Sequence, residues 1–505
     1  MKRILALLTV CIIVLGSGAL LPAQADTTPH TNWYEIFVRS FADSDGDGLG
    51  DLNGVREKLP YLTDLGFTGI WLMPIMPSPS YHKYDVTDYQ AIDPEYGTLD
   101  DFRALIETAH EIGIRVILDL PVNHTSVLHP WFQAAVEALR EGRSDDPYIE
   151  YYHFSRERSS AFVLLEGTEW YYEEQFSGGG MPDLNLDNPA VRDEIKDILA
   201  FWLNECDADG FRLDAVTSYY TGSAERNIEF LRFLKDNCET LKPGSFLVGE
   251  AWTGLSQIAA YYESGVDSFF LFPASQAEGY IAKALRGRSP ATGFAADLAK
   301  VRSAIPDGLI TPFIGNHDTG RAIGVLSARS DTRKAKFAYA LLRLLGGDTF
   351  TYYGDEIGMA GSRTDPDKRL AMNWSETERT QQPPGTSAEE YPLPGVYDQL
   401  ADEDSLLRYI KRVNALFAEW PQLSLQQEEI LTSSAYTLTF SRGENDERLY
   451  VLLNFSGKNE ETIELPLTGL SEAGNLLMPG TTYTLSEQGG VTTITLPPYA
   501  VLALQ

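Results

Sequence analysis

The sequence predicts an α/β fold in which eight parallel strands close into a (β/α)8 TIM barrel. The barrel is expected to carry a small inserted domain after the third strand and a C-terminal antiparallel β-sandwich. Strand-like apolar runs alternate with amphipathic stretches, which is typical of βα units in a parallel sheet. The gap after the third run is long, and beyond about Gln426 the alternation gives way to short strands separated by polar turns.

Each strand of the barrel is predicted from a β-branched or aromatic apolar run. The expected strands are Trp33–Phe41, Phe67–Ile75, Arg115–Asn123, Gly210–Val216, Ser245–Trp252, Ser268–Pro273, Leu309–Asp318 and Thr349–Gly354. Helical stretches such as Leu99–Ile112 and Asn188–Asn204 lie between them. In the first of these, Phe102, Leu105 and Ala109 recur at helical spacing.

The domain boundaries follow from these changes of pattern. We expect the barrel to occupy residues 26–123 and 187–422, interrupted by an inserted domain at 124–186. A loop as long as 124–186 inside a compact domain is usually functional or a subdomain. Residues 423–505 are expected to form the sandwich, with strands such as Tyr436–Phe440, Tyr450–Phe455, Thr481–Leu485 and Val491–Leu496.

The N-terminus reads as a secretory signal peptide, residues 1–25. It has a basic start at Lys2, an apolar core from Ile4 to Leu15 and a small-x-small cleavage site ending at Ala25. The core is too short to span a bilayer, and no later run qualifies. Cys11 leaves lipid attachment open as an alternative. We therefore expect a secreted or periplasmic protein without a stable membrane span.

Composition restricts the partner and the redox chemistry. The formal net charge is −32, from 40 basic and 72 acidic side chains, which argues against a nucleic-acid partner and is compatible with a neutral sugar polymer. Cys206 and Cys238 could form a disulfide or remain two buried thiols, and no Cys/His cluster has zinc spacing. The oligomeric state stays open.

Four short strings place carboxylates or imidazoles where strands are expected to end. They are Asp119–His124, Gly210–Ala215, Val248–Trp252 and Ile314–Asp318. In a parallel barrel the carboxyl ends of the strands meet on one face, so three acids from three strands would share one pocket. Such a set can cleave a glycoside, because one carboxylate attacks while another protonates the leaving oxygen.

Two of these acids have neighbours that suit opposite roles. Arg212 lies two residues before Asp214, on the same side of the strand, and would keep it ionised as a nucleophile requires. Glu250, with Trp252 nearby, could occupy a partly apolar site that keeps its proton for delivery. Structural alternatives are a salt bridge at Asp214 and an ordinary strand-end acid at Glu250. An N-cap at Asp318 and a merely hydrogen-bonded His124 are further alternatives.

A second motif predicts a calcium site. Acids occupy positions one, three, five and nine of a loop, with Gly48 at position six, and together with the carbonyl of Leu49 they could surround Ca²⁺. The four acids are Asp43, Asp45, Asp47 and Asp51. Position twelve is Gly54 and not Glu, so the loop is no EF-hand. A solvated acidic turn is the alternative.

Over nearly the whole mature chain, these residues closely resemble glycoside hydrolase family 13, the α-amylase family. The resemblance includes Ser80–Tyr89, Tyr353–Gly358 and Met181–Asn185, the last similar to a group between oligo-1,6-glucosidases and neopullulanases. It implies that Asp214 is the nucleophile, Glu250 the acid/base and Asp318 the acid that stabilises the transition state. It also implies that Arg212, His124 and His317 bind the sugar and that Tyr84 stacks on its ring, and it supports calcium at the aspartates.

The expected activity is therefore that of a retaining α-glucan hydrolase of the α-amylase type. The resemblance also implies a preference for α-1,4 bonds of starch and maltooligosaccharides, because α-1,6-specific relatives usually carry valine at the position of the small Ala215. A 4-α-glucanotransferase, a maltogenic enzyme or a cyclodextrin-degrading enzyme of the same family is the alternative, because the covalent intermediate can pass to sugar or to water. A non-catalytic glucan-binding protein would lack the three acids that this chain carries.

Overall fold

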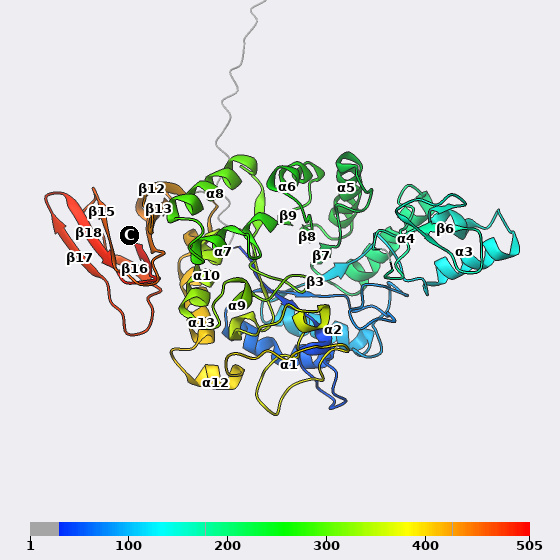
Figure 1. The fold of residues 1–505 in the computed structure, drawn as a ribbon, viewed down its shortest axis with the longest axis horizontal. Helices are drawn as coiled ribbons and strands as arrows, with labels where there is room; N and C mark the ends of the chain where they lie inside the picture. The colour runs from blue at the N-terminus through cyan, green and yellow to red at the C-terminus, as the bar shows by residue number, and fades with distance from the viewer. Residues whose placement is uncertain (1–29, 177, 427) are drawn as a thin grey trace, which may run out of the picture.

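The computed structural model describes residues 30–505 except 177 and 427. Its centre is an eight-stranded parallel sheet in the order β10-β9-β8-β7-β3-β2-β1-β11. The strands are β1 (Asn32–Ile36), β2 (Gly69–Leu72), β3 (Arg115–Leu120), β7 (Gly210–Leu213), β8 (Phe246–Gly249), β9 (Ser268–Phe270), β10 (Leu309–Thr311) and β11 (Thr349–Tyr352). Backbone N–H groups of Asp348 and Phe350 donate to the carbonyls of Ile310 (3.1 Å) and Pro312 (3.2 Å). These bonds join the two outer strands, so the predicted (β/α)8 barrel is confirmed (Figure 1).

The strands are shorter than the sequence predicted. Val38–Ser40 forms a 3-10 helix and does not continue β1, and Pro121 and Pro312, which follow β3 and β10, cannot donate a ladder hydrogen bond. The prediction that a strand runs up to Asp318 was wrong. After β10 the chain turns instead, because the side-chain oxygen of Asn316 accepts from the backbone N–H of Asp318 and of Thr319, each at 3.0 Å.

Helices cover the outside of the barrel. The longer ones are α1 (Leu52–Asp64), α2 (Leu99–Glu111), α4 (Pro189–Ala200), α5 (Ala224–Leu241), α8 (Ala291–Ala304), α10 (Arg333–Leu344) and α13 (Leu406–Glu419). The shorter ones are α6 (Leu255–Tyr261), α7 (Tyr280–Leu285), α9 (Ala322–Val325), α11 (Asp365–Lys368) and α12 (Val396–Ala401). Helix α2 begins at a capping box between Thr98 and Asp101. Helix α4 begins after the N-cap Asn188 and passes into a π-helical turn at Phe201–Glu205.

Large side chains fill the barrel interior. Trp33 on β1 lies between Phe246 and Phe350, with ring centroids 5.2 and 5.6 Å apart and nearly parallel planes. Trp71 on β2 and Phe270 on β9 pack in the same cluster. The barrel is therefore a packed core, and its chemistry is confined to the loops at one end.

Two further units lie at opposite ends of the molecule's long axis (Figure 1). Between β3 and β7 the chain forms α3 (Pro130–Glu141) and a small antiparallel sheet of β4 (Phe154–Ser155), β6 (Tyr171–Glu173) and β5 (Phe162–Leu164). We call this segment the inserted domain. Isolated bridges pair His124 with Asp183 and Tyr152 with Leu184. The beginning and the end of the inserted domain therefore lie side by side.

The C-terminal unit consists of two antiparallel sheets. One has the order β12-β13-β14-β19-β16 and the other β15-β18-β17. The strands are β12 (Glu429–Ser433), β13 (Thr437–Arg442), β14 (Leu449–Asn454), β15 (Glu461–Leu465), β16 (Glu472–Asn475), β17 (Thr484–Gln488), β18 (Val491–Leu496) and β19 (Val501–Leu504). Leu452, Ile463, Ile494 and Leu502 from both sheets share one apolar core, as a sandwich requires.

The structure also answers the cysteine question. Cys206 and Cys238 are buried free thiols. In the described part of the chain no helix is long and apolar enough to cross a membrane. The predicted signal peptide, its cleavage near Ala25 and Cys11 lie outside the described residues.

Candidate active site

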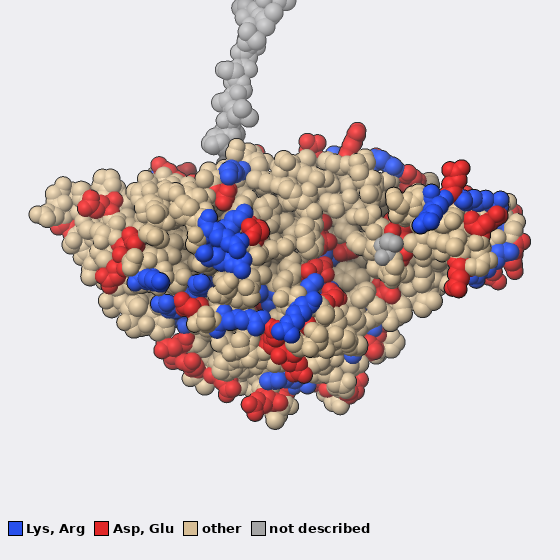
Figure 2. All heavy atoms as spheres, in the orientation of Figure 1, with Lys and Arg blue, Asp and Glu red and all other residues tan. Residues whose placement is uncertain are grey.

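The three predicted acids line a single cavity at the carboxyl ends of the strands. Asp214 directly follows β7 and Glu250 directly follows β8, and the last residues of these strands, Leu213 and Gly249, are register partners. The turn after β10 brings in Asp318 from the loop. The cavity measures about 270 Å³, and acidic side chains surround the hollow between the barrel and the inserted domain (Figure 2).

Arg212 is the fully buried cation of the cluster. One terminal nitrogen lies 2.8 Å from Asp119 Oδ1 and 2.5 Å from Asp214 Oδ1, and the other lies 3.0 Å from Glu250 Oε1. A single guanidinium therefore bridges three carboxyl groups from three neighbouring strands. This arrangement can keep Asp214 ionised while it holds Glu250 beside it.

Glu250 has the protonation behaviour of a general acid. Burial raises its pKa, Arg212 partly opposes that rise, and the charge of Asp214 adds to it, so that the pKa reaches about 7. The backbone N–H of Ala215 donates to Glu250 Oε2 at 3.1 Å. Ala215 can aim that N–H at the carboxyl because its backbone is left-handed, with a φ of 47°. The site thus places a protonatable carboxyl beside the carboxyl of Asp214 and the guanidinium of Arg212.

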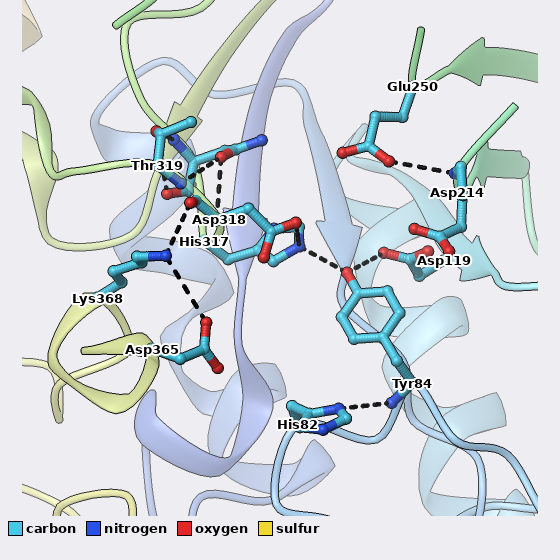
Figure 3. A network of polar contacts seen from close by, with 12 residues as sticks. His82, Tyr84, Asp119, Asp214, Glu250, His317, Asp318, Thr319, Asp365 and Lys368 are labelled. Carbon is cyan, nitrogen blue, oxygen red and sulfur yellow. Dashed lines mark hydrogen bonds and ion pairs between the residues drawn. The ribbon is translucent and has the colours of Figure 1, made fainter. Parts of the chain in front are cut away.

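A second charged group surrounds His317. Its Nε2 lies 3.0 Å from Asp318 Oδ2 and 2.7 Å from the hydroxyl of Tyr84 (Figure 3). Its Nδ1 lies 2.6 Å from Glu35 Oε1. Burial alone would lower the pKa of His317, but Asp318 and Glu35 raise it to about 10. Burial alone would raise the pKa of Asp318, but His317 and Arg369 hold it well below its ordinary value. Asp318 therefore stays ionised.

The predicted sugar-binding residues all lie at this site. Tyr84 and His124 line the cavity, and the hydroxyl of Tyr84 donates to Asp119 Oδ2 at 2.9 Å. His124 Nε2 lies 3.3 Å from the carbonyl of Tyr84, and burial lowers its pKa. Arg212 and His317 lie just below the cavity and contact its acids.

Four residues of the site had no predicted role. Asp119 begins one of the quoted strings, and Glu35 is a carboxylate within a buried strand. Asp365 and Arg369 form an ion pair at i, i+4 spacing and both line the cavity, and Arg369 lies 3.2 Å from Asp318 Oδ1. The sequence feature that could have pointed to Glu35 is a charged residue inside an apolar strand. For Asp365 and Arg369 it is an acid and an arginine four residues apart.

The predicted calcium ligands lie in residues 43–51, which we call the aspartate loop. Carboxylate oxygens of Asp43, Asp45 and Asp51 come within 4.8 Å of one another. Asp47 is not in this group, and its carboxylate accepts from the backbone N–H of Leu49 at 2.7 Å. The aspartate loop also touches the segment after β11, because Gln381 N–H donates to the Gly48 carbonyl at 2.7 Å. Three clustered carboxylates fit a hard cation such as Ca²⁺.

Known proteins share this architecture. Residues 35–424 match the family model described as "Alpha amylase, catalytic domain". The chain is 38% identical to "Alpha-amylase 3" of Dictyoglomus thermophilum over 441 residues, 84% of each chain. It is 34% identical to a "4-alpha-glucanotransferase" of Thermotoga neapolitana over 371 residues, 68% of this chain and 76% of that one.

Solved structures agree. "Eubacterium rectale Amy13B" superposes with a TM-score of 0.89 at 40% identity, covering 95% of this chain and 96% of its own. An α-amylase from H. orenii superposes with a TM-score of 0.84 at 34% identity, covering 94% and 99%. The residues matched by the family model, 35–424, span the positions of Asp214, Glu250 and Asp318. The chain therefore belongs to glycoside hydrolase family 13, the α-amylase family.

Proposed function

We propose that this protein is a retaining α-amylase that hydrolyses α-1,4 bonds of starch and maltooligosaccharides. One observation carries the proposal: Arg212 joins the carboxyls of Asp214 and Glu250 at adjacent strand ends, with Glu250 near a pKa of 7. That pairing supplies an ionised nucleophile and a proton donor in one cavity, and Asp318 completes the set of acids.

In the first step Asp214 attacks the anomeric carbon. Glu250 gives its proton to the glycosidic oxygen, so the leaving sugar departs neutral. Positive charge builds on the sugar ring, and ionised Asp318 is placed to stabilise it more strongly in the transition state than in the ground state. We expect the two carboxyls to lie about 5–5.5 Å apart, the spacing of retaining enzymes.

In the second step water replaces the departed sugar. Glu250, now ionised, takes a proton from that water, which attacks the anomeric carbon and frees Asp214. Two inversions leave the product with its original configuration. First products in the β configuration by NMR would therefore refute Asp214 as the nucleophile.

The α-1,4 preference and endo-type cleavage rest on Ala215 and on relatives. Ala215 lines the cavity beside the nucleophile, and its small side chain leaves room for the adjoining sugar. The relatives include proteins named α-amylase. Exclusive activity on isomaltose or sucrose would contradict this assignment.

A 4-α-glucanotransferase is the second candidate, and an exposed aromatic surface favours it. Trp252, two residues beyond Glu250, lines the cavity with half of its side chain exposed and stacks on Phe272 at 4.9 Å. A second sugar could stack on that ring and accept the intermediate in place of water. A relative named 4-alpha-glucanotransferase is 34% identical.

Product chromatography distinguishes the two activities. The wild-type protein is incubated separately with starch, pullulan, cyclodextrin and maltotriose. Hydrolysis yields short maltooligosaccharides from starch and only products shorter than the substrate from maltotriose. Transfer yields products longer than maltotriose. Asp214→Asn protein, which should form neither set, controls for contaminating enzymes.

We also propose one structural Ca²⁺ at the aspartate loop and secretion of the mature protein. Asp43, Asp45 and Asp51 would hold the ion, and Asp47 and the Leu49 carbonyl are the remaining predicted ligands. Bound calcium would neutralise the loop's carboxylates and stabilise the fold by binding to the folded state. N-terminal sequencing of the exported protein, with a start near Asp26 expected, tests the secretion proposal.

A further inference from the structure

We propose that Glu35 is a positioning residue that keeps His317 doubly protonated and directed at Asp318 and Tyr84. This proposal rests on the proposed glycoside-cleaving function of the site. Glu35 is not among the residues that line the cavity. It would act on the reaction only through His317.

Glu35 and His317 form a dry contact across the barrel. Glu35 lies within β1, where its register partners are Tyr352 on β11 and Trp71 on β2. Its side chain is 1% exposed and that of His317 is 0% exposed. Glu35 Oε1 lies 2.6 Å from Nδ1 of His317 and 3.4 Å from its backbone N–H. Both side chains are therefore removed from bulk solvent, and the imidazole lies directly against the Glu35 carboxyl.

The neighbours of the imidazole decide how many protons it carries. Ionised Glu35 can only accept, so Nδ1 must bear a proton. On the other side Nε2 faces Asp318 Oδ2 at 3.0 Å, and ionised Asp318 also can only accept. A neutral ring with its proton on Nδ1 would direct a lone pair at that carboxylate. Both carboxylates accept a hydrogen bond from the ring only when Nδ1 and Nε2 of His317 each carry a proton.

Tyr84 fits the same proton assignment. Its hydroxyl lies 2.7 Å from His317 Nε2 and 2.9 Å from Asp119 Oδ2 (Figure 3). When Nε2 donates, the hydroxyl accepts from His317 and gives its own proton to Asp119. The chain Glu35, His317, Tyr84, Asp119 then has one donor at each contact.

Charges of both signs face this chain from the surrounding strands. Carboxyls stabilise the imidazolium from β1 and the loop after β10. More distant carboxyls lie within β3 and directly after β7 and β8. Arg212 and Arg369 oppose it. The groups are Glu35, Asp318, Asp119, Asp214, Glu250, Arg212 and Arg369. Of these, only Glu35 and Asp318 contact the imidazole nitrogens directly. Asp318 meets the sugar, which leaves Glu35 as the residue whose one contact with the site is His317.

The experiment measures the protons on His317 directly. Histidine-selective 15N labelling and NMR report whether one or both ring nitrogens are protonated, and His317 is assigned by its contact with the Tyr84 hydroxyl, lost in Tyr84→Phe. In the wild-type protein we expect both nitrogens of His317 to stay protonated from pH 6 to pH 8. A neutral ring at pH 8 would overturn the proposal, whatever the products of the enzyme prove to be.

Glu35→Gln separates charge from orientation. The glutamine amide can donate to Nδ1, so a neutral ring could keep Nε2–H directed at Asp318. We expect the titration midpoint of His317 to fall by at least about one pH unit, a tenfold loss of proton affinity. We also expect kcat to fall roughly tenfold to a hundredfold with KM little changed, because Asp318 acts mostly in the transition state.

Glu356→Gln is the matched control. Glu356 is also a fully buried glutamate; it accepts from the hydroxyls of Tyr34 and Tyr61 and does not contact the cavity. This variant should lose stability without changing the His317 titration or the ratio of kcat to KM. A folded Glu35→Gln protein with an unchanged His317 midpoint would overturn the proposal. If Glu35→Gln does not fold, the wild-type spectrum at pH 8 remains the test, and a neutral His317 ring there overturns the proposal.

Discussion

The catalytic cluster and the aspartate loop both gather carboxylates, but their charge is balanced in different ways. In the cluster, Arg212, His317 and Arg369 form ion pairs with the acids. In the aspartate loop, backbone N–H groups and a serine hydroxyl surround Asp43 and Asp51. Among the described residues no lysine or arginine pairs with the loop. The acids of the cluster therefore have cationic partners within the chain, whereas those of the loop have none among the described residues.

Removing the nucleophile should break the cluster's chemistry most severely. Asp214→Asn keeps the shape but cannot form the covalent intermediate, so kcat/KM on maltooligosaccharides should fall below roughly a thousandth of the wild-type value. Asp193→Asn, at an exposed aspartate paired with Lys196, is the control and should stay fully active. Substantial turnover by the Asp214 variant would remove that residue from its role.

Removing the internal cation should cost stability as well as activity. Arg212→Met leaves three carboxyls without their shared partner, and breaking a buried ion pair in this way costs about 3–5 kcal/mol of unfolding free energy. Arg226→Met breaks the exposed pair with Asp187 and should cost below about 1 kcal/mol. Urea unfolding of both variants provides the measurement. Equal losses would mean that burial does not distinguish the two pairs.

Chelation should affect the loop and leave the cluster intact. At calcium a hundredfold above its Kd, binding stabilises the folded state by about 2.7 kcal/mol, so EGTA should lower the Tm and added calcium should restore it. Asp45→Asn should abolish the response. The Asp214→Asn protein should respond like wild type, because its loop is unchanged. A calcium-independent Tm would identify the loop as a solvated acidic turn.

A change of pH should affect the cluster by a smaller, graded amount. The first step needs protonated Glu250, so kcat/KM should fall as pH rises through about 7 and then drop roughly tenfold per pH unit. Because the folded-state pKa is raised, the same group contributes stability below its ordinary pKa, and that contribution is lost as pH rises through about 7. Activity that stayed constant to pH 9 would contradict this assignment of the acid.

The sequence alone determined those parts of the fold that depend on local, periodic patterns of residues. Apolar runs, spaced helices and turn residues act locally, so the barrel, its eight strands and the sandwich could be predicted. The strings that contain Asp214 and Glu250 could be placed at strand ends because each acid follows its strand directly. Shared position at the carboxyl ends of parallel strands then implied one pocket.

Only the tertiary structure could supply the partners that come from distant strands. Glu35 and His317 are far apart in the sequence, and no local pattern predicts a 2.6 Å contact across a barrel. The strand that was expected to reach Asp318 ends at Thr311, before Pro312, and the Asn316 side chain holds a turn in the loop that follows. Periodicity describes which face a residue occupies, whereas ion pairs and pKa values depend on which other strands close around it, and barrel closure alone decides that.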